Sequence, residues 1–151
     1  MSKSGWFVGL VLVAGVGVFT YQLFTEPQST GRSMTPPDLS DIEDGASIAQ
    51  VTLPESFSDN ARLGKRIFEA KCSVCHGENA AGQKGIAPPL VHRTYEPSHH
   101  SDMAFVGAAR NGVRAHHWDF GNMPPVEGVT DGEVKLVVSY IRELQRANGI
   151  Y

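Results

Sequence analysis

The sequence predicts an all-α domain that follows a single N-terminal transmembrane helix and a linker. Three observations indicate this fold class: an uncharged apolar stretch near the N-terminus, an acidic polar segment after it, and helical periodicity without strand alternation or internal repeats in the remainder. The 151 residues are 41% hydrophobic and 19% charged, which is typical of a globular protein. The formal net charge of −3 argues against a nucleic-acid partner, because phosphate binding needs a basic surface.

The apolar stretch covers residues 6–24, WFVGLVLVAGVGVFTYQLF, and contains no charged residue. As a helix it would span about 28 Å, close to the hydrocarbon thickness of a bilayer. A cleaved signal peptide is the alternative, but its apolar region is usually about 7–15 residues long and ends at small residues. We therefore expect residues 1–24 to be an uncleaved anchor. Lys3 before the stretch and Glu26 after it favour a cytoplasmic N-terminus with the rest of the chain exported.

Residues 25–57 differ in composition from the segments on either side. They carry a net charge of −5, include Pro36 and Pro37, and contain few large apolar side chains. Such a segment buries too little surface to offset its ordering entropy, so we expect a flexible linker. Its root-mean-square span would be roughly 30 Å, enough for a tethered domain to move between membrane partners. A spacer with no shuttle role fits the composition equally well.

Residues 58–151 read as a domain with three helices separated by loops rich in Gly, Pro and His. Ser58 is a candidate N-cap for the first helix. The second is expected over residues 102–110, with a cap at Ser101. The third starts at the capping box of residues 130–133, TDGE, and ends before Asn148. Its apolar residues form one stripe: Val134, Val137, Tyr140, Ile141 and Leu144.

Both cysteines lie at the end of the first predicted helix, in the sequence Cys72-Ser-Val-Cys75-His76. This C-x-x-C-H pattern is the attachment signature of a c-type haem. Two thiols at this spacing add to the two haem vinyl groups, and the adjacent imidazole then faces the iron. A structural zinc site would need a second pair of ligands, and a thioredoxin-like dithiol would need a βαβ context; neither pattern is visible. We therefore expect one covalent haem c.

From about Ser58 to Asn148 the sequence resembles the class I c-type cytochromes. Gly64 and Phe68 resemble the family's glycine and aromatic on the first helix, and Tyr140 resembles the aromatic on the last. The resemblance implies that these two helices cross closely at the glycine. Ala87-Pro-Pro-Leu90 resembles the family's proline loop, which implies that the Pro88 carbonyl accepts the N–H of His76 and orients it. A simple turn is the alternative for this loop.

The resemblance also implies a methionine as the second axial ligand, on a loop before the last helix. Met123 fits this role, because it lies in Gly-Asn-Met-Pro-Pro just before the final helix. Met34 falls in the predicted linker, and Met103 falls on the second predicted helix, where core packing suits it better. We expect His76 and Met123 to be the iron ligands, a pair that raises the haem potential.

Two histidine pairs, 99–100 and 116–117, depart from the family pattern. Three interpretations stay open: solvated or hydrogen-bonding side chains, a second metal site for copper or zinc, and replacement of Met123 on the iron. Trp118 is expected to line the haem crevice and could donate a hydrogen bond to a haem propionate. His92 has no expected role beyond the proline loop.

Together these patterns predict an electron carrier rather than an enzyme. We expect a single-pass protein of a bacterial inner membrane, with its haem domain in the periplasm, shuttling electrons between respiratory or photosynthetic complexes. The partners would be redox proteins and the membrane, with no small-molecule substrate. Two alternatives remain: a fixed haem c subunit of a respiratory or dehydrogenase complex, and a haem enzyme or sensor in which the sixth ligand is labile.

Overall fold

The structure is a computed structural model that describes residues 15–17 and 34–151. The chain divides into two compact units, residues 1–32 and 33–151. In the first unit, residues 15–17 are helical, and the rest of the predicted anchor at 6–24 lies outside the described residues. No helix within the described ranges is long and apolar enough to cross a membrane.

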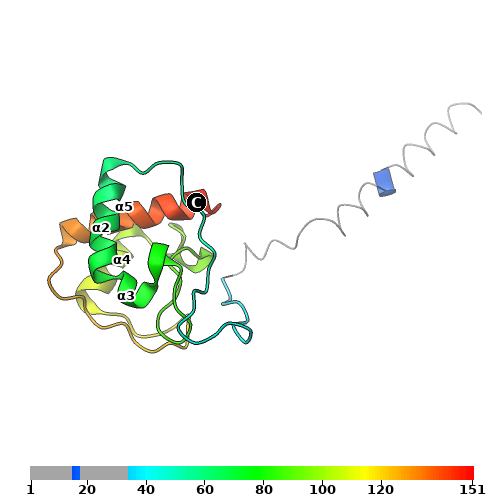
Figure 1. Cartoon of the computed structure of the whole chain (residues 1–151), viewed down its shortest axis with the longest axis horizontal. Helices are drawn as coiled ribbons and strands as arrows, with labels where there is room; N and C mark the ends of the chain where they lie inside the picture. Colours follow the sequence, from blue (N-terminus) through cyan, green and yellow to red (C-terminus); the bar gives the residue numbers. More distant parts are fainter. Residues whose placement is uncertain (1–14, 18–33) are drawn as a thin grey trace, which may run out of the picture. The chain divides into compact units, whose positions relative to one another are not determined.

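The second unit is helical, and within residues 34–151 the only β pairings are isolated bridges. Two long helices, α2 and α5, cross each other, with α4 beside α5 (Figure 1). The elements in chain order are α2 (Asp59–Lys71), α3 (Ser73–His76), the 3₁₀ turns η2 (Glu78–Ala80) and η3 (Arg93–Tyr95), α4 (Asp102–Asn111) and α5 (Asp131–Ala147). The all-α prediction is confirmed for this unit.

The helix ends agree closely with the sequence signals. The Ser58 side chain accepts a hydrogen bond from the Ala61 N–H and caps α2. Thr130 and Glu133 form both hydrogen bonds of the predicted capping box at α5. Ser101 precedes α4 as predicted, but its side chain makes no capping hydrogen bond.

Helices α2 and α5 meet at a glycine. A Cβ atom on Gly64 would overlap the backbone carbonyl of Leu136, so only glycine allows the two backbones to approach this closely. Nearby, the fully buried rings of Phe68 and Tyr140 pack 5.6 Å apart, centroid to centroid. The crossing that the family resemblance implied is therefore present.

The predicted flexible linker needs a correction over the part that the structure describes. Residues 34–57 lie against the helical unit: backbone N–H groups of Gly45 and Ala49 donate to the carbonyls of Lys84 and Ala81, both at 2.9 Å. Val51 and Phe57 pack against the buried core. The composition argument missed this because the backbone hydrogen bonds at residues 45–49 do not depend on side-chain composition.

Met103 on α4, whose expected role was core packing, is 59% exposed. Helical spacing alone does not say which side of the apolar stripe faces the partner helix. On α5 the whole predicted stripe is buried, because that helix is covered on two sides, by α2 and by α4.

Candidate haem site

The six residues predicted to form the haem site all line one cavity of about 560 Å³. This volume lies within the range of small-molecule and cofactor sites. The wall is mostly apolar, and no carboxylate side chain belongs to it among the described residues. The predicted residues are Cys72, Cys75, His76, Pro88, Trp118 and Met123.

The C-x-x-C-H motif takes its shape from the junction between two helices. Cys72 ends α2 and also precedes the short α3, whose last residue is His76. Gly77 then leaves the helix with φ of +72°. The Gln83 amide donates to the carbonyls of Val74 and Cys75 at 3.0 and 3.1 Å and holds the end of this turn. No sequence signal predicted the role of Gln83.

His76 is oriented by the proline loop. Its Nδ1 atom lies 2.9 Å from the carbonyl oxygen of Pro88. A carbonyl only accepts, so Nδ1 carries the proton and donates, which leaves the Nε2 lone pair free. The side chain is 9% exposed, and burial lowers the pKa of the imidazole, with the hydrogen bond to Pro88 acting in the opposite direction. A neutral imidazole with one fixed proton suits a metal ligand.

Both cysteines are free thiols. Cys75 is exposed and Cys72 is half-buried. Burial, with a smaller contribution from the neighbouring Cys75, raises the pKa of the Cys72 thiol to about 11. Both cysteines line the cavity, and neither forms a disulfide.

Met123 is held by its backbone. Its N–H and carbonyl form a two-way bridge with Val113, and both N···O distances are 2.9 Å. Gly112, at φ of +73°, ends α4 beside this bridge, and a Cβ atom there would press on the Met123 carbonyl. The neighbouring Asn122 side chain accepts from the Ala115 N–H at 3.0 Å. The loop therefore places a thioether at the cavity wall on a well-fixed backbone.

Trp118 carries an unsatisfied polar group. The side chain is 6% exposed, and its indole Nε1 has no hydrogen-bond partner among the described residues. It lies near the Tyr95 hydroxyl; burial raises the pKa of Tyr95, and the indole acts in the opposite direction. Buried polar atoms without partners are rare and indicate a missing acceptor. A carboxylate of a group bound in the cavity would supply one.

The histidine pairs also contribute to this region. His100, His116 and His117 line the cavity, whereas His99 does not. Burial is the main cause that lowers the pKa of His100 and of His117, and the neighbouring histidines lower it further. His92 caps η3 and packs edge-on against Trp118, with ring centroids 5.3 Å apart.

The sequence model of the family described as cytochrome c matches residues 61–145, more than half of the chain. The chain belongs to the cytochrome c family. This cytochrome c therefore binds haem c covalently and transfers electrons through it. A comparison with curated proteins found no match.

The residues of this cytochrome c fit the haem that its family implies. Two free thiols stand at the attachment spacing, the adjacent imidazole has a free Nε2, and a buried indole N–H lacks an acceptor. Cys72 and Cys75 would hold the haem through thioether bonds, and His76 would bind the iron. The bound haem supplies the one-electron iron couple.

Proposed function

We propose that this cytochrome c carries single electrons with His76 and Met123 as its axial iron ligands. The observation that carries the proposal is the bridge between Met123 and Val113. Because this bridge fixes the backbone on both sides of the Met123 Cα, little conformational entropy remains to be lost when the thioether binds iron. A permanently bound thioether also leaves no iron position for a substrate.

The surroundings of His76 and Met123 support electron transfer in which the iron binds no substrate. The Pro88 carbonyl fixes the His76 ring, so the imidazole need not reorient when the iron changes charge. The wall around the ligands is mostly apolar, so it would offer few polar groups that must reorient around the haem. The protein around the iron then needs to rearrange little between the ferrous and ferric states, as an electron carrier requires.

A matched pair of methionine variants tests this proposal. In the haem-loaded protein, Met123→Ala should lose the sulfur-to-iron absorption band and bind carbon monoxide in the ferrous state. Met103→Ala is the control, because this side chain is 59% exposed on α4 and does not line the cavity. It should keep the wild-type spectrum. An unchanged spectrum for Met123→Ala would refute His/Met ligation and point to a histidine ligand.

We further propose that residues 6–24 tether the domain to a bacterial inner membrane, with the haem domain in the periplasm. The uncharged length of that stretch supports this proposal. Replacing residues 1–24 by a cleavable secretory signal peptide keeps export and should release a water-soluble protein that keeps its haem spectrum. Persistence of the truncated protein in the membrane fraction would contradict the tether.

A fixed haem subunit is a second candidate, and the packed segment 34–57 favours it over a free shuttle. Backbone hydrogen bonds hold Gly45 and Ala49 against the helical unit, so residues 34–57 do not provide the flexible reach of roughly 30 Å that was predicted for residues 25–57 as a whole. Co-purification of a redox complex in mild detergent at constant stoichiometry would support the subunit; isolation of the cytochrome alone would support the shuttle.

A further inference from the structure

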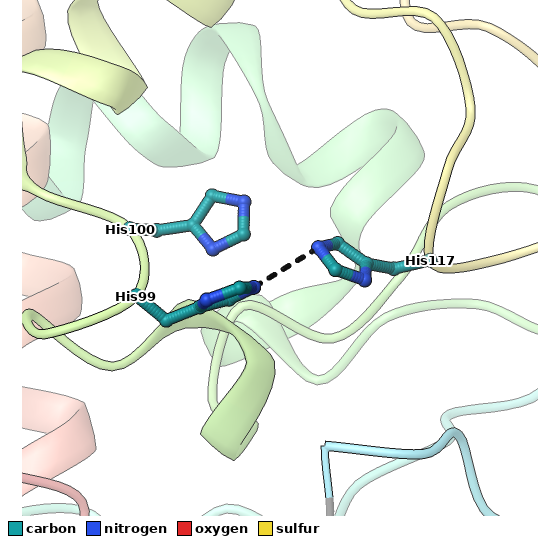
Figure 2. Close-up of side chains that lie close together, drawn as sticks. All are labelled: His99, His100 and His117. Carbon is teal, nitrogen blue, oxygen red and sulfur yellow. Dashed lines mark hydrogen bonds between the residues drawn. The ribbon is translucent and has the colours of Figure 1, made fainter.

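Three histidines outside the proposed iron ligation converge beside the haem cavity. His99 and His100 follow η3, and His117 comes from the loop between α4 and α5 (Figure 2). One nitrogen of each ring lies within 4.8 Å of the other two. Two loops, with 16 residues between His100 and His117 in the sequence, thus bring three imidazoles together beside the cavity.

Two of these nitrogens already stand at the separation found between ligands of one metal ion. The Nε2 atoms of His99 and His117 are 3.2 Å apart, joined by the dashed line in Figure 2. With metal–nitrogen bonds of 2.0–2.1 Å, two imidazole ligands of a tetrahedral ion are about 3.3–3.4 Å apart. The third nitrogen, from His100, lies within 4.8 Å of both.

The proton on His100 is placed as in many metal-binding histidines. Its Nδ1 donates to the Thr94 carbonyl at 2.6 Å, which leaves the Nε2 lone pair available. The backbone of this loop is also braced, because the buried guanidinium of Arg142 donates to the carbonyls of His100 and Tyr95. The imidazoles are therefore carried by a loop that is fixed before any ion binds.

The ligand set selects the class of ion. Neutral imidazoles suit zinc and copper, whereas calcium and magnesium need oxygen ligands. The nearby Glu96 carboxylate is already engaged by Arg93 and by the Ser98 hydroxyl. His99 is exposed, so an ion can enter from solvent and keep water as a fourth ligand.

We propose that His99, His100 and His117 form a second metal site, which binds one Zn²⁺ or Cu²⁺ ion. The ion would tie the loop at residues 96–101 to the loop at residues 112–125, which carries Met123. Metal binding would therefore stabilise the side of the cavity where the methionine ligand is held. His116 is not a ligand in this proposal, although its ring centroid lies 4.3 Å from that of His117, because its nitrogens fall outside the cluster.

Titration of the full-length, haem-loaded protein with Zn²⁺ by calorimetry tests the site directly. The protein must carry no polyhistidine tag. We expect saturable binding of one ion, an at least tenfold weaker affinity in His99→Ala and in His117→Ala, and no saturable binding in the double variant. A copper-loaded sample should show imidazole nitrogen couplings in its electron paramagnetic resonance spectrum, and the couplings should disappear in the double variant.

His116→Ala is the matched control, because it removes a neighbouring imidazole that lies outside the cluster. It should change the affinity less than threefold. The haem absorption spectrum of every variant verifies that the fold and the iron ligands are intact. Failure of wild-type protein to bind Zn²⁺ or Cu²⁺ at millimolar concentration, or equal weakening by His116→Ala and His99→Ala, would overturn the proposal.

Discussion

The Nδ1 atom of His76 donates its proton to the carbonyl oxygen of Pro88 across 2.9 Å. This contact joins the haem-attachment motif to the proline loop and leaves Nε2 free for the iron. The position of the Pro88 carbonyl therefore determines which His76 nitrogen carries the proton and how the ring is oriented.

The buried hydrogen bond between His76 and Pro88 should protect the Nδ1 proton from solvent. In the ferrous haem-loaded protein, nuclear magnetic resonance should show this proton exchanging slowly. Pro88→Ala frees the backbone φ angle of the acceptor residue, so exchange should accelerate at least tenfold. Exchange in the wild type as fast as in free imidazole would show that the contact does not persist.

The crossing of α2 and α5 should not tolerate a methyl group at Gly64. Because the added Cβ meets the Leu136 backbone, Gly64→Ala should lower the free energy of unfolding by about 3 kcal/mol or more. Gly107→Ala on α4 is the matched control, since nothing lies within 4 Å of its added Cβ. Helix propensity should make that change neutral or stabilising by up to about 1 kcal/mol. Urea unfolding followed by circular dichroism measures both; equal effects would contradict the close crossing.

Alkaline pH should destabilise the fold through Tyr140. Burial, then the carboxylates of Glu69 and Glu78, raises the pKa of Tyr140 from 10.0 to about 12. The folded state holds this proton more tightly, so the stabilisation is complete below pH 10 and is lost as the pH rises to about 12. Two pKa units correspond to about 3 kcal/mol at most. Between pH 9.5 and 12, the free energy of unfolding should therefore fall further in the wild type than in Tyr140→Phe. If the free energies of unfolding of the two proteins fall in parallel over this pH range, the raised pKa of Tyr140 is contradicted.

The indole N–H of Trp118 should gain an acceptor when haem is bound. If a haem propionate is that acceptor, Trp118→Phe should lower the free energy of unfolding of the haem-loaded protein by about 1–3 kcal/mol. Phe keeps most of the apolar contact, including the stacking on Phe120 at a centroid distance of 5.6 Å. Urea unfolding followed by haem absorbance provides the measurement. An unchanged stability would mean that the N–H stays unpaired or bonds to water.

Much of this architecture could be predicted from local sequence. The capping residues Ser58 and Thr130 marked the starts of two helices, because capping is a local hydrogen bond within four residues. The C-x-x-C-H motif could be assigned for a similar reason, because its chemistry sets a narrow spacing, whereas the role of Pro88 was implied by the resemblance to the class I c-type cytochromes.

Features that depend on distant partners could not be predicted in this way. The Val113 partner of Met123 lies across a loop, and the backbone contacts that hold residues 34–57 leave no pattern in the side chains. Arg142 was indistinguishable from an exposed helical arginine, yet it is buried and bonds to Asp102, Tyr95, Gln145 and His100. The exposure of the Met103 side chain likewise depends on how α4 is rotated about its axis against α5.

The central claim is that the iron keeps both His76 and Met123 through its redox cycle. A spectroelectrochemical titration of the wild-type, haem-loaded protein with and without carbon monoxide tests it most directly. We predict one reversible one-electron transition with the same midpoint in both titrations, because no ferrous position is open to the gas. A midpoint that rises under carbon monoxide would contradict the claim, since it would show that the gas binds the ferrous iron and displaces a ligand.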